Sequence, residues 1–91
     1  PSTAITIENL GTLLINLGNY TSAKTCYQKV LTINSQHNGN NHHETARTTG
    51  NLALAFANLQ QYEKARSCYQ KNIKIFTTYI VNTLLSNNYS N

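Results

Sequence analysis

Two cysteines and three histidines are the residues of this 91-residue chain that could form a metal or redox site. The histidines cluster in one polar stretch and are His37, His42 and His43. A zinc site needs four ligands, commonly with cysteines or carboxylates at defined spacing. Glu44 is the one acid near the histidines, and neither Cys26 nor Cys68 is close to them in sequence. We therefore expect no metal site and no bound cofactor.

The residue pattern also lacks a catalytic constellation. The chain has no aspartate, its serines lack a Gly-x-Ser-x-Gly context, and no glycine-rich loop could cradle a phosphate. We therefore expect that the protein is not an enzyme.

Composition and charge narrow the class further. Hydrophobic residues make up 40% of the chain and charged residues 11%, which excludes a highly charged disordered segment. The net charge of +4 arises without any run of five basic residues, so it marks no nucleic-acid footprint. No stretch approaches the roughly eighteen apolar residues of a membrane span, so we expect no membrane contact.

An internal repeat organises the chain. Shifted by forty-two residues, the sequence matches itself at fourteen of thirty-three positions without a gap. The longest match pairs Cys26-Tyr27-Gln28-Lys29 with Cys68-Tyr69-Gln70-Lys71. Ordered leucine, tyrosine, alanine and cysteine matches do not arise from biased asparagine and threonine content, so the repeat is real.

Each repeat unit has the pattern of two helices. Apolar residues recur every three or four positions and predict helices over about 3–17, 20–34, 44–59 and 62–76. The first stripe consists of Ile7, Leu10, Leu14 and Leu17. Gly18-Asn19 and Gln60-Gln61 form the turns, and period-2 alternation, the mark of a strand, is absent from both units.

Small residues mark where the helices should cross closely. Gly11 and Ala53 occupy one equivalent position, and Ala23 and Ala65 another. A glycine inside a helix costs about 1 kcal/mol relative to alanine. We therefore attribute Gly11 to close backbone approach between antiparallel helices.

These residues resemble the tetratricopeptide repeat family, whose pattern has Leu-Gly, a Gly-x-Tyr turn and a following alanine. The residues that carry the resemblance are Leu10-Gly11, Leu14, Gly18-Asn19-Tyr20, Ala23, Tyr27 and Ile33. The forty-two-residue period, Gly39-Asn40-Asn41-His42 and Asn51-Leu52-Ala53 are similar to the kinesin-light-chain type. The resemblance implies an all-α fold, a right-handed superhelical stack of two repeats plus a C-terminal helical extension.

The expected organisation is repeat 1 over 1–42, repeat 2 over 43–76, and an extension over 77–91. Pro1 fits inside a family motif, from which we expect that the chain is a fragment of a longer array. The extension is expected to be helical to about Leu85 with a disordered end, although its β-branched residues leave a strand open. Asn72 replaces the alanine that usually receives a next repeat. The extension could cap the stack, or the exposed repeat ends of two chains could pair as a homodimer.

The repeat also predicts the distance between the two cysteines. Equivalent places on adjacent repeats lie about 10 Å or more apart, whereas a disulfide needs Cα atoms about 4.4–6.8 Å apart. We therefore expect Cys26 and Cys68 to be unpaired. Free thiols suit a reducing compartment, which gives a cytoplasmic location.

The resemblance implies a concave groove, lined by the first helix of each repeat, that receives a peptide. Mapped by position, its residues are Ile5, Glu8, Asn9, Thr12, Asn16, Arg47, Gly50, Asn51, Leu54 and Asn58. Asparagine amides both donate and accept, so a ladder of them can hold a peptide backbone. We expect a scaffold or adaptor module that binds a protein or peptide partner. A structural spacer or self-association segment is the alternative, and nucleic-acid binding through lysines of the second helices is the least favoured.

Overall fold

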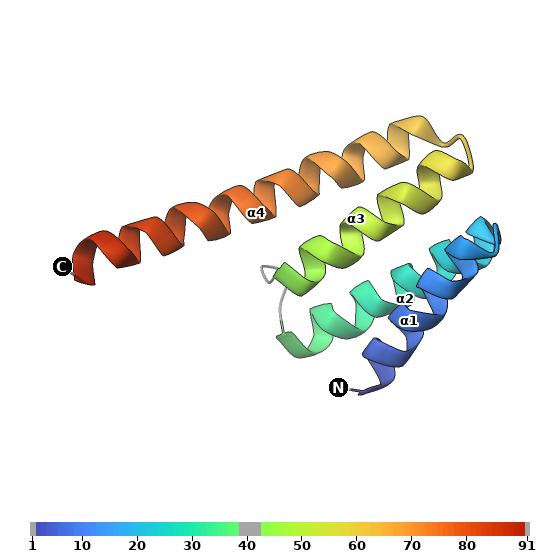
Figure 1. Ribbon diagram of the computed structural model, residues 1–91, viewed down its shortest axis with the longest axis horizontal. Coiled ribbons are helices and arrows are strands. Elements are labelled where there is room, and N and C mark those ends of the chain that lie inside the picture. Colours follow the sequence, from blue (N-terminus) through green and yellow to red (C-terminus); the bar gives the residue numbers. More distant parts are fainter. Residues whose placement is uncertain (1, 39–42, 91) are drawn as a thin grey trace.

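The computed structural model describes the backbone of residues 2–38 and 43–90, and the side chains of residues 3–36 and 44–87. It contains α1 (Ser2–Asn16), α2 (Tyr20–Asn38), α3 (His43–Asn58) and α4 (Tyr62–Ser90), with no strand among the described residues. Helices α1 and α2 form one antiparallel hairpin and α3 and α4 another, with α3 beside α2 (Figure 1). The expected all-α stack of helical hairpins is thus confirmed.

Both hairpins close through the same left-handed turn. Gly18 has φ 80°, and Gln60, the equivalent residue of the second unit, has φ 63°. The next amide then reaches back five residues, from Asn19 N to the Leu14 carbonyl at 2.8 Å and from Gln61 N to the Phe56 carbonyl at 2.9 Å. This is a Schellman ending, which satisfies helix carbonyls that would otherwise lack partners.

A close approach between α1 and α2 explains Gly11. A Cβ built on Gly11 would lie 2.9 Å from Cε1 of Tyr27 and 3.3 Å from Cβ of Cys26. The Tyr27 side chain is itself only 1% exposed, so its ring has no room to move away. Glycine therefore occupies this position because the ring of Tyr27 fills the space of a side chain.

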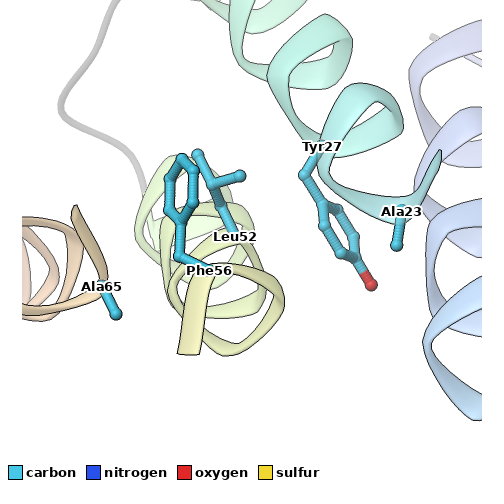
Figure 2. Close-up of a cluster of buried hydrophobic side chains, with 5 residues drawn as sticks. All are labelled: Ala23, Tyr27, Leu52, Phe56 and Ala65. Atoms are coloured by element: carbon cyan, nitrogen blue, oxygen red, sulfur yellow. The ribbon is translucent and has the colours of Figure 1, made fainter. Parts of the chain in front are cut away.

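The core lies where α3 packs between α2 and α4. Figure 2 shows Ala23 and Tyr27 of α2 on one side, Leu52 and Phe56 of α3 in the middle, and Ala65 of α4 on the other. Two alanines thus let large side chains of the neighbouring helix fill the gap, which is the interlocking that the small-residue pattern predicts.

The structure differs from the predicted helices at three places. Leu10 and Leu17 of the expected inner stripe are exposed, because α1 has neighbours only on the side of α2 and α3. Helix α2 continues to Asn38, since no glycine or proline interrupts it before Gly39. Helix α4 continues beyond Leu85 to Ser90, because the chain has neither glycine nor proline after Gly50.

Helix α4 therefore runs past the stack. Its C-terminal half extends beyond the start of α3 as one straight helix and does not fold back over the repeats (Figure 1). The strand that the β-branched residues left open does not form over the described part of this segment. Nearer its start, Asn72 fills the space beside Gly50, with Nδ2 3.0 Å from where a Cβ would lie.

Gly11→Ala should destabilise the protein by up to about 2 kcal/mol. Overpacking a core typically costs about 1–3 kcal/mol, and the gain in helix propensity returns only about 1 kcal/mol. Gly50→Ala is the matched control, because its new methyl group would meet the amide end of the partly exposed Asn72, which can rotate. Urea unfolding measures both, and equal stability of the two variants would contradict the close-approach explanation.

Gln60→Gly should stabilise the protein by about 0.5–1 kcal/mol, because a left-handed conformation costs a non-glycine residue about 1–2 kcal/mol. Gly18→Ala should have the opposite effect of similar size. Nothing lies within 4 Å of a Cβ on Gly18, so this loss would come from backbone strain alone. Thermal unfolding of the two variants measures both effects. Melting temperatures that change in the same direction in both variants would contradict the explanation by left-handed backbone strain.

Candidate functional site

A hollow of about 490 Å³ lies between α1 and α3, the first helices of the two repeats. The residues that line it are Ile5, Glu8, Asn9, Thr12, Glu44, Arg47 and Asn51. Six of these seven belong to the groove that the sequence predicts. The hollow forms because α1 and α3 each pack on α2 and touch one another only slightly, which leaves a furrow between them.

Glu8 fastens the two sides of this hollow. Its side chain is only 12% exposed, and its Oε1 lies 3.4 Å from Nη2 of Arg47. Its Oε2 accepts hydrogen bonds from Thr48 Oγ1 at 3.2 Å and from Asn51 Nδ2 at 3.4 Å. A largely buried carboxylate needs such partners, since leaving a charged group unsatisfied costs more than each bond contributes.

The donors to Glu8 differ in strength. Arg47 is 62% exposed, so its ion pair contributes at most about 1 kcal/mol. Thr48 is fully buried, and its hydroxyl also lies 3.0 Å from the Glu44 carbonyl. Because a hydroxyl has a single proton, Thr48 serves one of these two acceptors at a time. Asn51 is the remaining donor, so its amide holds α3 to α1.

Thr12 connects the hollow to the core. Its hydroxyl lies 3.2 Å from the hydroxyl of Tyr27 and 3.2 Å from the Glu8 carbonyl. Burial raises the pKa of the Tyr27 hydroxyl above its usual value, and the charge of Glu8 adds to the rise, while the hydrogen bond with Thr12 opposes it. The phenol therefore stays protonated and keeps one wall of the hollow in place.

The four asparagines of the expected ladder are not equivalent. Asn9 lines the hollow and is exposed, whereas Asn51 already donates to Glu8. Asn16 and Asn58 lie outside the hollow, and Asn58 Nδ2 donates to the Leu54 carbonyl of its own helix at 2.9 Å. The structure thus brings together only the first pair of the ladder.

Two further residues of the expected groove lie outside the hollow, and one residue that was not expected there lines it. Leu54 is exposed but does not line the hollow. Gly50 is half-buried beside Asn72 and is likewise absent from the lining. Glu44 lines the hollow, but the predicted groove does not include it. Glu44 precedes Arg47 by three residues and Asn51 by seven, which places all three on the same face of the helix.

Basic residues gather on the second helix of each repeat, as the sequence indicates. They are Lys24, Lys29, Lys64, Arg66, Lys71 and Lys74. Lys24 and Lys64 both lie over the ring of Phe56, with Nζ 6.0 Å and 5.8 Å from its centroid. At this distance a cation–π contact contributes about 0.5–1 kcal/mol at an exposed site. Two of the six cations therefore lie over the core.

The remaining candidate residues form no metal or redox site within the described part of the chain. Cys26 and Cys68 are free and half-buried, and burial raises the pKa of the Cys68 thiol, with Lys71 opposing the rise. The three histidines lie outside the residues whose side chains are described. Among the described residues, no three potential metal ligands come together. None of the described helices has the length and apolarity to cross a bilayer.

Comparison with known proteins establishes the class. A family model for the tetratricopeptide repeat matches residues 2–78. This chain belongs to the tetratricopeptide repeat family, whose non-catalytic helical repeats generally mediate contacts between proteins. The kinesin-light-chain subtype stays a prediction. The comparison with curated proteins finds no match.

Glu8→Ala should destabilise the protein by about 1–2 kcal/mol, because it removes the acceptor for Asn51 and one acceptor for Thr48. Arg47→Ala is the comparison and should cost less than about 0.5 kcal/mol, since this side chain is largely exposed. Chemical denaturation followed by circular dichroism measures both. A Glu8→Ala loss no larger than that of Arg47→Ala would show that the carboxylate does not hold the helices together.

Proposed function

We propose that the protein is an interaction module that binds an extended peptide segment of a partner protein in the furrow between α1 and α3. The observation that carries this proposal is the open hollow of about 490 Å³, lined by one apolar side chain and several polar ones. Binding sites of this kind take affinity from main-chain hydrogen bonds and specificity from side-chain contacts.

The residues that line the furrow would make different contacts with a bound peptide. Asn9 is exposed, and its side-chain amide makes no hydrogen bond with another of the described residues, so it can both donate to and accept from a peptide unit. The side chain of Asn51 donates one proton to Glu8, and its Oδ1 has no donor among the described residues. Ile5, which is exposed, supplies apolar contact at the end of the furrow.

Fixed walls favour binding at this position. Glu8 and Tyr27 hold α1 to its neighbours through bonds that are already formed in the free protein. A peptide would therefore order itself against a site whose geometry is already in place, which lowers the entropic cost of binding. Scaffold or adaptor action in the cytoplasm fits this proposal, since free cysteines suit a reducing compartment.

Two other functions have weaker support. Nucleic-acid binding would use the basic residues of α2 and α4, but Lys24 and Lys64 are drawn to Phe56. Association between copies of this chain is favoured by a specific observation, the large apolar side chains that α4 exposes. Self-association and peptide binding would use different helices, so one does not exclude the other.

The experiment begins with a random-peptide display library selected on the protein. Affinities of the selected peptides are then measured by fluorescence anisotropy for the wild type and for Asn9→Ala. We expect Asn9→Ala to weaken binding about fivefold to tenfold, the worth of one or two lost hydrogen bonds. Because the side chain of Asn9 makes no hydrogen bond with the described residues, helicity and stability should not change.

Asn82→Ala is the control, since Asn82 is exposed on α4, far from the furrow. Peptides that bind Asn9→Ala as tightly as the wild type would contradict the proposal. Peptides that lose affinity equally for Asn82→Ala would also contradict it. A loss of affinity in both Asn9→Ala and the double variant Asn9→Ala/Asn51→Ala supports it.

A further inference from the structure

Helix α4 carries an apolar stripe that nothing covers in the described structure. We call it the outer face of α4, and it consists of Tyr69, Ile73, Phe76, Ile80 and Leu84, all exposed. The spacing of three and four residues aligns them on one side of the helix, over a length of about 22 Å. The shielded side of α4 is a different one and runs through Ala65, Cys68, Asn72 and Ile75.

In the first repeat, another helix covers the face that corresponds to the outer face of α4. The equivalent face of α2 is covered by α3, and Tyr27 there is only 1% exposed. Tyr69, its counterpart forty-two residues later, is 42% exposed. Tyr27 is buried because its ring lies against Gly11 of α1 and because α3 lies beside α2. In the second repeat Ala53 stands at the Gly11 position, and no described helix lies on that side of α4.

The described chain does not supply the missing helix. Residues 81–90 extend α4 away from the stack and do not turn back over it (Figure 1). A helix laid on the outer face must instead be long, apolar and without charge at its centre. Helix α4 has these properties, since no charged residue occurs after Lys74.

We propose that the outer face of α4 binds the same face of a second copy of this chain, with the two helices antiparallel about a two-fold axis. The spacing of the stripe makes it complementary to itself in this orientation. Phe76 lies next to Phe76 of the second copy at the axis, Ile73 opposite Ile80, and Tyr69 opposite Leu84. No pair of like charges is brought together, and Arg66 lies near Asn87 of the second copy.

The area that the two copies would bury indicates how strongly they would associate. Fully covered aromatic side chains such as Tyr69 and Phe76 bury roughly 150–250 Å² each. Five half-exposed side chains on each copy, with Val81 and Leu85 beside them, would remove on the order of 1,000 Å² in total, the lower limit for a specific interface. The dimer is therefore weak and forms as protein concentration rises.

Head-to-tail stacking of α4 on α1 is less well matched. Apart from Ile5, which lines the furrow, the large apolar residues exposed on or just after α1 are Leu10, Leu13 and Leu17, which span only about 10 Å. That pairing would leave Ile80 and Leu84 uncovered.

Sedimentation equilibrium over about a hundredfold range of protein concentration tests the proposal by mass action. The wild type should rise from the monomer mass of 10.2 kDa towards twice that mass. Ile80→Glu should raise the dissociation constant about 100-fold, because symmetry places the new charge in the interface twice. Ile80 is exposed in the single chain, so helicity should not change.

Asn82→Glu is the matched control on the opposite side of α4 and should dimerise as the wild type does. Mixing Ile73→Lys with Ile80→Glu should restore part of the dimer, because the antiparallel register places the two new charges in contact. Parallel helices would not bring them together.

Three results would overturn the proposal: a mass of 10.2 kDa at every concentration, equal losses in Asn82→Glu and Ile80→Glu, or loss of association in Leu13→Glu. The last would show that α1 of another copy is the occupant. The inference does not rest on peptide binding, since Asn9→Ala should leave the dimer intact, and Ile80→Glu should leave peptide affinity unchanged.

Discussion

The contact between Gly11 and the ring of Tyr27 is the constraint on which the other features depend. It lets α1 approach α2 closely enough for the tyrosine hydroxyl to reach Thr12, at the edge of the furrow. The opposite side of α2 is then covered by α3, which Glu8 ties back to α1. The width and stiffness of the furrow thus follow from one residue without a side chain.

The second repeat does not reproduce this arrangement. Ala53 stands where the first repeat has Gly11, Tyr69 is exposed, and Asn72 replaces the buried Val30. The amide of Asn72 lies with its Nδ2 beside Gly50, and its buried Oδ1 has no hydrogen-bond partner among the described residues. Large apolar residues that α4 exposes, with no described helix over them, form a surface suited to association.

Much of the fold is legible in the sequence, because helical spacing and turn chemistry are local. The forty-two-residue self-match identifies both hairpins, and glycine in the helix points to the close approach at Gly11. The spacing of residues in the sequence does not reveal which side-chain amides already form hydrogen bonds within the fold. The use of Asn51 by Glu8 and of Asn58 by its own helix depends on how the helices lie, and so does the exposure of Leu10.

Hydrogen exchange at single amides tests the central claim most directly, that α2 has a helix on both of its sides and that α4 is open on one side. At low protein concentration, amides of α2 around Tyr27 should be the best protected, and those of α4 beyond Phe76 should exchange close to the rate of an unprotected helix end. Protection along α4 should then increase with concentration. Equal and concentration-independent protection of α2 and the whole of α4 would contradict the account.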